Sequence, residues 1–472
     1  MKTQNYIDSN WSSSKNSERI NVLDKYTQFQ MAEVEIIDDE QMEQALEAST
    51  KAFKKLKALS AGDRIDLLKQ LAAKLRLRQG EFQELLVHEA GKPTMYAKAE
   101  VERSLATLEM AIEEARRFGG EKVSVDYGPG AGKEAFTKRF PVGPIFCLTP
   151  FNFPLNLMMH KLAPALAIGC PVIIKSSPLT PLTALLFSEL VHEISFPKGS
   201  VQVVNTSIEQ TQKMIQDSRV AMVSFTGSAE IGWKLKAMVP KKKVVLELGG
   251  NAAVIIDQNS DWERAARLCV ASAYLYSGQV CISTQRIYVH DSLREQFESL
   301  LVSETKKIKH GNPKEMDVIA GPLISKEHVL RIESWVQEAI TMGAKVLVKG
   351  EKMEAHNLLT PWLMTNTKPE MKIVAEEVFG PLAILESFKT RGEAIELVNR
   401  SRYGLQTGVF TNDLSFAKEC LESLEVGAVV INHPPAFRVD SMPYGGVKDS
   451  GFGREGVRYA MEEMSEPRLF IF

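Results

Sequence analysis

The chain has 472 residues, of which 44% are hydrophobic and 25% are charged, a balance typical of a globular protein with a sizeable core. Its 57 basic and 59 acidic side chains leave a net charge of -2, which argues against nucleic acid or an anionic membrane as a partner. A single core rarely grows beyond about 250–300 residues, so we expect two or more domains.

The N-terminal residues carry no apolar secretory signal, and the longest apolar run, LAPALAIGCPVII, is shorter than the roughly 20 residues of a membrane span. We expect this run to be buried core. The cysteines are scattered without a CxxC pair, which argues against a disulfide framework and a structural zinc site. Free thiols are therefore expected at Cys147, Cys170, Cys269, Cys281 and Cys420, in a protein of the reducing cytoplasm.

Residues 38–118 are expected to be helical, because apolar residues recur at spacings of three and four. Residues 121–140 alternate on both sides of a Gly/Pro turn, which predicts a protruding β-hairpin. This hairpin has few residues with which to bury its own surface, and packing against another subunit is one solution. The strand-like C-terminal segment, MEEMSEPRLFIF, could pair with the hairpin.

From residue 144, short apolar runs alternate with helical stretches, which predicts βαβ units and a doubly wound parallel sheet. The five strand candidates are PIFCL, PVIIK, SVQVV, VAMVSF and KVVLEL. A second alternation, over residues 250–446, predicts a second α/β domain. Ligands of such sheets bind beyond the carboxyl ends of the strands, so the residues directly after each strand are the functional candidates.

Cys281 lies in YLYSGQVCISTQRI, between a helix-like run and a strand-like run. A lone cysteine is ordinarily a small buried hydrophobic residue. Gly278 and the polar neighbours indicate instead a loop or a helix start, where backbone N–H groups can favour a thiolate. A thiol with a pKa of about 8.5 is mostly protonated at neutral pH, so a nucleophile needs such help or a nearby base.

Glu247 and Asn152 are the candidate partners of this thiol. Glu247 ends the apolar run VVLELGG, where it is either an outward-facing edge residue or a buried general base whose pKa is raised by burial. Gly249 and Gly250 follow it and permit a tight turn or a close ligand. Asn152 in TPFNFPLN is either a turn-forming residue or an amide donor to an oxyanion.

Other candidates concern a dinucleotide. SFTGSAEIG places Gly227 and Ser228 where a strand becomes a helix, and a helix N-terminus with a capping serine suits a diphosphate. Lys175, which ends PVIIK, is either a solvated strand end or a ligand of ribose hydroxyls. The GxGxxG match at 451–456 is expected to be a loop, because no βαβ unit can follow it there. GPGAGK lacks the spacing and the Ser/Thr of a P-loop.

Seven segments resemble, in order, those of the NAD(P)-dependent aldehyde dehydrogenase superfamily, of the hydrolytic type: TPFNFPL, FTGSAEIG, LELGG, GQVCISTQR, GPLIS, EEVFGP and PYGGVKDSGFGREG. The resemblance implies an α/β fold with a Rossmann-like cofactor domain, an α/β catalytic domain and a β-hairpin oligomerisation element. The corresponding ranges are 1–120 with 141–249, then 250–446, and finally 121–140 with 447–472. It also implies a homodimer or homotetramer that oxidises a small aldehyde without a metal.

The resemblance further implies the role of each site residue. Cys281 attacks the aldehyde to give a thiohemiacetal, whose oxyanion is held by the Asn152 amide and a backbone N–H at the cysteine. Loss of hydride to the nicotinamide leaves a thioester, and Glu247 activates the water that hydrolyses it to a carboxylic acid. The implied cofactor-binding residues are Thr149, Pro150, Phe151, Lys175, Ser177, Gly227, Ser228, Leu248, Glu377 and Phe379.

One departure from the family pattern concerns the choice between NAD and NADP. Many NAD-preferring relatives have a Glu that binds the adenine ribose three residues after the strand-end lysine, where this chain has Pro178. Without this carboxylate a 2′-phosphate meets less repulsion, and Lys175 and Ser177 could contact it. We therefore expect NADP to be tolerated, with the preference open. A second departure, Asn251 where Lys is common, implies nothing further.

Two other functions stay open. An acylating relative passes the acyl group to coenzyme A and commonly lacks a base at the Glu247 position. A catalytically idle binding or structural protein on the same scaffold would not need the thiol, the carboxylate and the amide together.

The substrate is the least determined feature. Phe151, Met159, Phe437 and Arg438 are candidates to border an entry tunnel. Arg438 either binds a small anionic or hydroxylated aldehyde such as lactaldehyde or pairs with a structural carboxylate such as Asp440.

Overall fold

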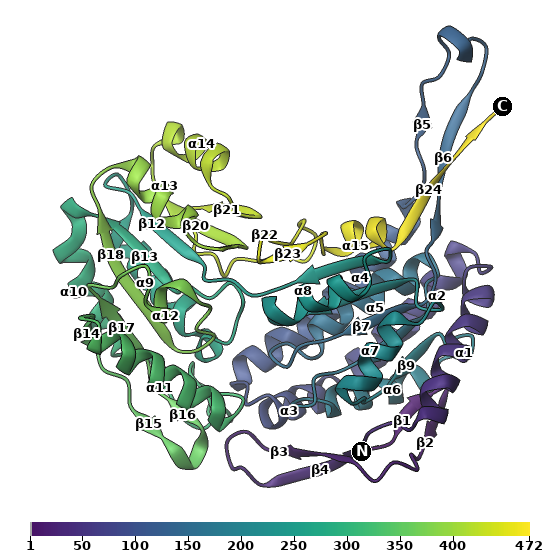
Figure 1. The fold of residues 1–472 in the computed structure, drawn as a ribbon, viewed down its shortest axis with the longest axis horizontal. Coiled ribbons are helices and arrows are strands. Elements are labelled where there is room, and N and C mark those ends of the chain that lie inside the picture. Colours follow the sequence, from purple (N-terminus) through teal and green to yellow (C-terminus); the bar gives the residue numbers. More distant parts are fainter. Residues whose placement is uncertain (1) are drawn as a thin grey trace.

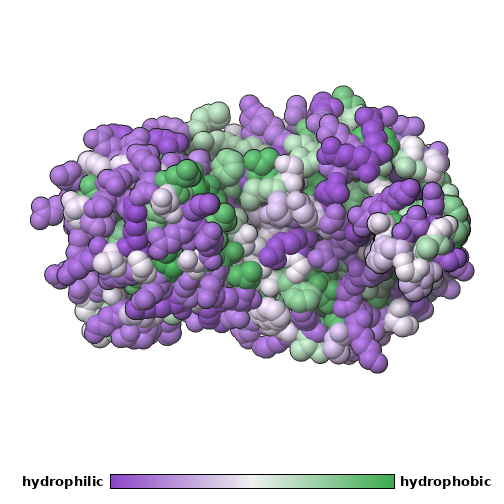
Figure 2. Space-filling view, turned by 90° about the horizontal axis from the view of Figure 1, so that it is seen from above, coloured by the Kyte–Doolittle hydropathy of each residue, from purple (hydrophilic) through white to green (hydrophobic). Residues whose placement is uncertain are grey.

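A computed structural model describes residues 2–472. The chain forms two α/β lobes, each built on its own sheet, and a β-hairpin projects from one of them (Figure 1). Seen from above, the surface is mostly hydrophilic, with hydrophobic residues in separate areas (Figure 2).

The first sheet contains all five strands predicted for it, in parallel. They are β7 (Ile145–Leu148), β8 (Val172–Lys175), β9 (Val201–Val203), β10 (Met222–Thr226) and β11 (Lys243–Glu247). The order β9-β8-β7-β10-β11 changes direction between β7 and β10, the kind of switch point beyond which doubly wound sheets bind their ligands. Short strands flank them: β1 (Asn5–Ile7), β2 (Asn10–Ser12) and β23 (Gly451–Phe452).

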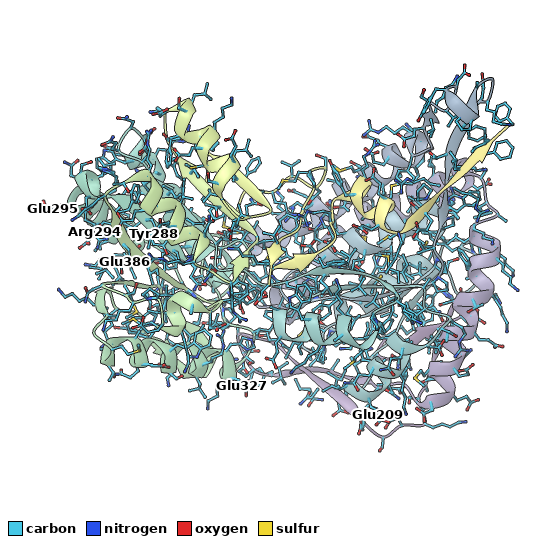
Figure 3. The ribbon with its side chains drawn as sticks, turned by 45° about the horizontal axis from the view of Figure 1, so that its top comes forward. Glu209, Tyr288, Arg294, Glu295, Glu327 and Glu386 are labelled. Atoms are coloured by element: carbon cyan, nitrogen blue, oxygen red, sulfur yellow. The ribbon has the colours of Figure 1, made fainter. Side chains whose placement is uncertain are left out.

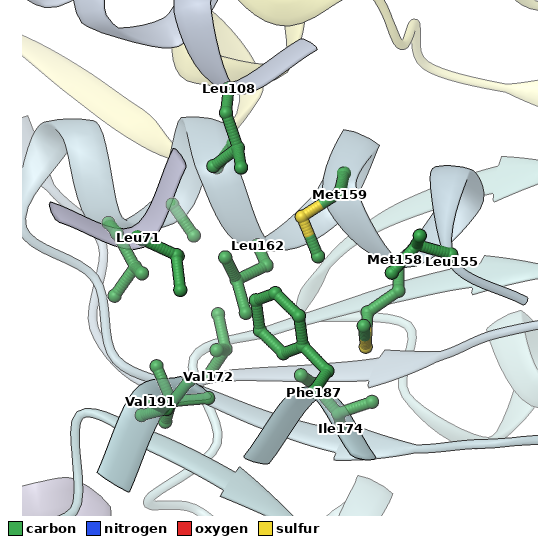
Figure 4. Close-up of a cluster of buried hydrophobic side chains, with 14 of the residues drawn as sticks. Leu71, Leu108, Leu155, Met158, Met159, Leu162, Val172, Ile174, Phe187 and Val191 are labelled. Atoms are coloured by element: carbon green, nitrogen blue, oxygen red, sulfur yellow. The ribbon is translucent and has the colours of Figure 1, made fainter. Parts of the chain in front are cut away.

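Helices pack on this sheet and confirm the helical prediction for 38–118. They are α1 (Asp39–Leu56), α2 (Ala61–Leu77), α3 (Gln79–Glu89), α4 (Thr94–Arg117), α5 (Asn156–Ile168), α6 (Leu182–His192), α7 (Ile208–Gln216), α8 (Ala229–Met238) and α15 (Val457–Glu463). Capping boxes at Asp38 and Ser60 satisfy the first amides of α1 and α2. Leu71, Leu108, Leu162 and Phe187 meet in the core between α2, α4, α5 and α6 (Figure 4).

The second lobe confirms the second predicted α/β alternation. Its sheet has the order β14 (Lys345–Val348), β17 (Trp362–Thr365), β18 (Leu382–Phe388), β13 (Arg286–His290), β12 (Ala253–Ile256), β20 (Gln406–Phe410) and β21 (Ala428–Ile431). All neighbours are parallel except β14 and β17. The helices are α9 (Trp262–Tyr274), α10 (Arg294–Thr305), α11 (Lys326–Thr341), α12 (Lys372–Ala375), α13 (Arg391–Asn399) and α14 (Leu414–Ser423).

The projecting hairpin consists of β5 (Lys122–Val123) and β6 (Ala135–Pro141), as predicted. The C-terminal strand β24 (Ser465–Ile471) pairs antiparallel with β6 along its whole length, which confirms the predicted pairing (Figure 1). Smaller ladders join β3 (Arg19–Leu23) with β4 (Gln30–Glu35), β15 (Lys352–Met353) with β16 (Leu358–Leu359), and β19 (Tyr403–Gly404) with β22 (Val447–Lys448).

The expectation of a loop at 451–456 is wrong for its first two residues. Gly451 and Phe452 form β23, which pairs antiparallel with the end of β11, opposite Glu247 and Leu246. Edge strands present unpaired backbone groups, and a distant segment covers this one. Such a two-residue strand has no local sequence pattern by which it could be predicted.

The cysteines are free thiols, as expected; Cys281 is partly exposed and the other four are buried. The apolar run 162–174 is buried throughout, as expected. Within residues 2–472, no helix combines the length and apolar character needed to cross a membrane. Over the same residues, no group of three or more His, Cys, Asp or Glu side chains is arranged to hold a metal ion.

Candidate active site

A cavity of about 170 Å³ is lined by residues of both lobes. Glu247 reaches it from the end of β11, Asn152 from the turn after β7, and Cys281 from the loop that precedes β13. The fold thus brings together the three residues for which we predicted catalytic roles. They come from three separate segments, each placed at the end or start of a buried strand.

Cys281 lies in a turn after the short 3₁₀ helix Leu275–Gly278, where Tyr276 and Ser277 have positive φ angles of 46° and 57°. Of the two expected settings, a loop and a helix start, the structure confirms the loop. Burial raises the pKa of the thiol to about 11, although the Tyr444 hydrogen bond and the Arg438 charge oppose this rise. The thiol therefore needs help from neighbouring side chains.

Glu247 is 3% exposed, which excludes the outward-facing alternative. Both carboxylate oxygens are buried, and neither has a hydrogen-bond partner among the described residues. Burial, aided by the nearby charge of Glu455, raises the pKa of Glu247 well above its usual value, as predicted. A buried carboxylate with free acceptor atoms beside a cavity can take a proton from water.

Asn152 is buried, and its Nδ2 donates to the backbone carbonyl of Gln279 over 3.0 Å. The Gln279 side chain is itself fixed, because Oε1 accepts from the Ile324 N–H and Nε2 donates to the Pro322 carbonyl. An amide group carries two N–H donors, so the second stays available for an oxyanion.

The cofactor candidates Gly227, Ser228 and Leu248 directly follow the carboxyl ends of β10 and β11. Ser228 occupies the N-cap of α8, but its hydroxyl makes no capping hydrogen bond, contrary to our expectation. The Gly227 N–H donates to the Glu247 carbonyl over 3.0 Å and joins β10 to β11. A Cβ on Gly232 would lie 2.4 Å from Leu248, so α8 packs directly on this residue.

Lys175 ends β8 and is half-buried rather than fully solvated. Its Nζ has no hydrogen-bond or ion-pair partner within the described residues, and burial lowers its pKa to about 8. A half-buried cation without an anion, beyond the carboxyl end of a parallel strand, fits an anionic dinucleotide. The nearby Ser177 hydroxyl accepts from the Leu179 N–H over 3.2 Å.

Glu377 and Phe379 come from the second lobe. Glu377 accepts the Gly250 N–H at Oε1 over 2.9 Å, and its other oxygen would be 2.2 Å from a Cβ on Gly249. Only glycine permits this approach. Residue Glu377 is partly exposed. Desolvation of its carboxyl raises the pKa of Glu377 to about 7.

Phe379 packs edge-to-face on Phe151, with ring centroids 5.7 Å apart. Thr149 and Pro150 precede Phe151 in the turn after β7, and the Thr149 N–H donates to the Lys175 carbonyl over 3.1 Å. The predicted cofactor residues Phe151 of the first lobe and Phe379 of the second lobe therefore meet beyond the carboxyl end of β7.

Three of the four expected tunnel residues do not line the cavity. Met159 is completely buried in the helical core (Figure 4). Phe151 packs on Phe379, and the exposed Phe437 lies edge-to-face on His433. The expectation for Met159 is wrong, because this residue of α5 packs into the core, whereas the expectations for Phe151 and Phe437 stay predictions.

Arg438 does line the cavity and pairs with structural carboxylates, as one alternative predicted, whereas its binding of an aldehyde stays a prediction. Its side chain is 8% exposed and approaches Asp440 and Glu455 only to 3.7 and 3.9 Å. Asp440 has closer partners, Arg103 at 2.6 Å and His160 at 3.0 Å. The Nε of Arg438 is buried and makes no hydrogen bond among the described residues, although Asp440 is 3.7 Å away, and Nη2 lies 3.3 Å from the Nε2 of His160.

Other cavity residues were not predicted. Tyr444 places its hydroxyl 3.1 Å from the Cys281 sulfur. Glu455 lies near Glu247 and pairs with the buried Lys161 at 2.6 Å. Tyr444 and Glu455 belong to the quoted motif PYGGVKDSGFGREG, but nothing in its spacing indicates which side chains turn toward the thiol.

Arg103 lines the cavity with Tyr96 and Glu100, at helical spacing on one face of α4. Their spacing of four and three residues could have been recognised in the sequence.

Asn251, which departs from the family pattern, has a structural role. It donates a hydrogen bond to the Val374 carbonyl and accepts one from the Ser401 hydroxyl.

Comparison with known proteins identifies the family. The sequence profile described as "Aldehyde dehydrogenase family" matches residues 11–470. A 3-sulfolactaldehyde dehydrogenase of Priestia aryabhattai is 40% identical over 468 residues, which cover 99% of this chain and 97% of the relative. A lactaldehyde dehydrogenase of Methanococcus maripaludis is 36% identical over 471 residues, with 99% of each chain covered.

Solved structures agree with these matches. Aldehyde dehydrogenase 21 of Physcomitrella patens, in complex with the reaction product succinate, superposes with a TM-score of 0.95 at 37% identity, covering 99% of this chain and 98% of the other. NADP-dependent glyceraldehyde-3-phosphate dehydrogenase of Bacillus halodurans, complexed with NADP, gives 0.96 at 30% identity, covering 100% and 99%. The chain belongs to the aldehyde dehydrogenase family and is an NAD(P)-dependent aldehyde oxidoreductase.

Proposed function

We propose that Cys281, Asn152 and Glu247 carry out aldehyde oxidation by a hydrolytic route in this cavity. The Cys281 thiolate adds to the aldehyde carbon, and the carbonyl oxygen becomes the alkoxide of a thiohemiacetal. The free N–H of Asn152 stabilises this alkoxide. Bound NAD(P)⁺ supplies the hydride acceptor. Water then attacks the resulting thioester and gives a proton to Glu247, and cleavage of the C–S bond releases a carboxylic acid and the Cys281 thiolate.

The convergence of the three side chains on one cavity carries this proposal. Glu247 also supports hydrolysis over transfer to coenzyme A, because its two unpaired oxygens are free to orient water. Product analysis with and without coenzyme A distinguishes the two routes: we expect the free acid in both, whereas an acyl-coenzyme A product would contradict hydrolysis.

For the cofactor, we propose that the dinucleotide lies beyond the carboxyl ends of β7, β8 and β10. The N-terminus of α8, with Gly227 and Ser228, suits the diphosphate, and Lys175 with Ser177 suits the adenosine ribose. Glu377 and Phe379 then position the nicotinamide end, beside Leu248 and the segment Thr149–Pro150–Phe151. The unpaired Lys175 cation and the uncapped α8 terminus support this arrangement.

For the substrate, we propose a short aldehyde with an anionic or hydroxylated tail, as in lactaldehyde or 3-sulfolactaldehyde. The cavity of about 170 Å³ is smaller than the roughly 300–1,000 Å³ of drug-sized sites. The Arg438 guanidinium lines this space, and a cationic donor group of this kind suits an anionic or hydroxyl oxygen. The names of the similar dehydrogenases point to the same chemistry.

We also propose a homodimer or homotetramer assembled through 121–140 and 447–472. Phe136, Phe470 and Phe472 lie together on the projecting strands and are 42%, 55% and 60% exposed. Contiguous apolar surface of this kind is typical of an interface.

The two sheets support a cofactor domain of 1–120 with 141–249 and a catalytic domain of 250–446. The free thiols support a reducing compartment such as the cytoplasm.

The test is a screen of aldehydes with NAD⁺ and NADP⁺, followed by NAD(P)H absorbance. We expect lactaldehyde and 3-sulfolactaldehyde to give a higher kcat/KM than propanal, which lacks a polar tail. Cys281→Ala should abolish NAD(P)H formation. Retained activity in this variant would overturn the mechanism, and a preference for propanal would overturn the substrate class.

A further inference from the structure

The mechanism proposed above leaves one contact at the nucleophile without a role. The hydroxyl of Tyr444 lies 3.1 Å from the sulfur of Cys281, and either atom could be the donor. Tyr444 is 4% exposed and lines the same cavity. A buried hydroxyl within hydrogen-bond distance of a reacting atom changes the energy of that atom, in a direction set by which group donates.

The ionisation states assign the donor. A thiolate has no proton and can only accept, so the phenol must donate once Cys281 is ionised. Burial first, and then the Cys281 charge, raise the pKa of Tyr444 well above its usual value. The phenol therefore keeps its proton while the thiol loses its own.

The charges around Cys281 explain why a donor is needed. Glu247 and Glu377 oppose ionisation of the thiol, as does burial, and Arg438 favours it. The Arg438 guanidinium carbon lies 3.7 Å from the centre of the Tyr444 ring. A cation on the face of a phenol withdraws electron density, which makes the O–H a stronger donor.

The backbone fixes the hydroxyl in place. The Tyr444 N–H donates to the Glu455 carbonyl over 2.9 Å, and the Glu455 N–H donates to the Tyr444 carbonyl over 2.7 Å. The residue is thus held by a two-bond bridge on its backbone and by a cation on its ring. A donor fixed in this way loses little entropy when it engages the sulfur.

We propose that Tyr444 is a further catalytic residue, whose hydroxyl donates a hydrogen bond to the Cys281 thiolate and fixes the direction of the sulfur in the cavity. This inference rests on the proposed role of Cys281 as the nucleophile. It predicts that the tyrosine oxygen, and not only the ring, is needed for thiol reactivity.

The test is Tyr444→Phe in the full-length protein, with the rate of iodoacetamide alkylation at Cys281 followed by peptide mass spectrometry across pH. Loss of a hydrogen bond to a charged group should move the profile about one pH unit higher and slow alkylation about tenfold at neutral pH. The NAD(P)H burst should slow by a similar factor, since both reactions use the thiolate. The unfolding temperature should stay within a few degrees of that of the unchanged protein.

Tyr288→Phe is the matched control, because Tyr288 lies in the second lobe (Figure 3). This variant removes a buried hydroxyl that accepts a hydrogen bond from Arg286 over 3.3 Å. It should leave the Cys281 profile unchanged. A Tyr444→Phe profile identical to that of this control would overturn the inference.

Cys281→Ala separates the two proposals. If this variant still produces NAD(P)H, Cys281 is not the nucleophile, and the proposed role of Tyr444 is wrong as well. If it is inactive and Tyr444→Phe reacts like the unchanged protein, only the role of Tyr444 is wrong.

Discussion

The Nδ2 of Asn152 donates a 3.0 Å hydrogen bond to the backbone carbonyl of Gln279, two residues before Cys281. This bond joins the turn after β7 to the loop that carries the thiol, and so links the two lobes at the cavity. It also orients the amide, because one N–H is used and the other is left for the substrate oxygen.

Asn152→Ala should therefore lower kcat by about a hundredfold to a thousandfold, since the alkoxide loses a fixed donor. Asn152→Asp keeps the shape but replaces donors with acceptors, and it should be at least as impaired. Single-turnover kinetics check this, because the loss should fall on NAD(P)H formation. A normal rate of this step in both variants would exclude Asn152 from oxyanion stabilisation.

Glu247→Gln should separate the two halves of the reaction. The amide cannot take a proton from water, so the thioester should accumulate after one burst of NAD(P)H, and steady-state turnover should fall by about a hundredfold to ten-thousandfold. Intact-mass spectrometry should detect the acyl adduct on Cys281. Unchanged turnover would remove Glu247 from the mechanism.

The raised pKa of Glu247 also predicts how stability depends on pH. Its folded-state pKa lies above the unfolded value of about 4.3, so unfolding releases a proton between these two values. The contribution of Glu247 to the free energy of unfolding therefore falls as pH rises through this window. Glu247→Gln lacks this dependence, so its melting temperature should exceed that of the unchanged protein at neutral pH, with the gap closing below about pH 4. A gap independent of pH would contradict the raised pKa of Glu247.

Arg438→Gln should affect substrates according to their tails. A lost contact to a buried anion costs about 2–5 kcal/mol, so kcat/KM for 3-sulfolactaldehyde should fall by at least about thirtyfold. Propanal has no polar tail that could contact Arg438, so its kcat/KM reports only the effect of the substitution on the Cys281 thiol and serves as the internal control. Equal losses for both aldehydes would show that Arg438 does not select the tail.

Pro178→Glu should change the cofactor preference. A carboxylate three residues after Lys175 would repel a 2′-phosphate and accept bonds from ribose hydroxyls, so kcat/KM should fall for NADP⁺ relative to NAD⁺ by about tenfold or more. Pro178→Ala is the matched control for loss of the proline ring. The unchanged protein should favour NAD⁺ by less than about a hundredfold, or about 2.7 kcal/mol. A larger ratio would contradict tolerance of NADP.

The sequence by itself determined the elements and the identity of the main reactive groups. The pattern of apolar residues predicts the five strands of the first sheet, the helices of 38–118 and the hairpin. Regular spacing indicates an element with one buried face, and an uninterrupted apolar run indicates an element that is buried on all sides. Glu247 and Asn152 could be named because they lie at or shortly after the carboxyl end of such a run, where ligands of parallel sheets lie, and Cys281 because polar residues follow it in the loop before β13.

Only the tertiary structure decided what surrounds those groups. Met159 faces the core and Arg438 faces the cavity, although their local sequences distinguish neither direction. The pKa of Cys281 is raised rather than lowered, because burial and two carboxylates outweigh the Tyr444 hydrogen bond and the Arg438 charge. Tyr444 reaches the sulfur from 163 residues away. Local pattern encodes which face of an element is buried, whereas the electrostatics of a site depend on side chains that only long-range packing brings together.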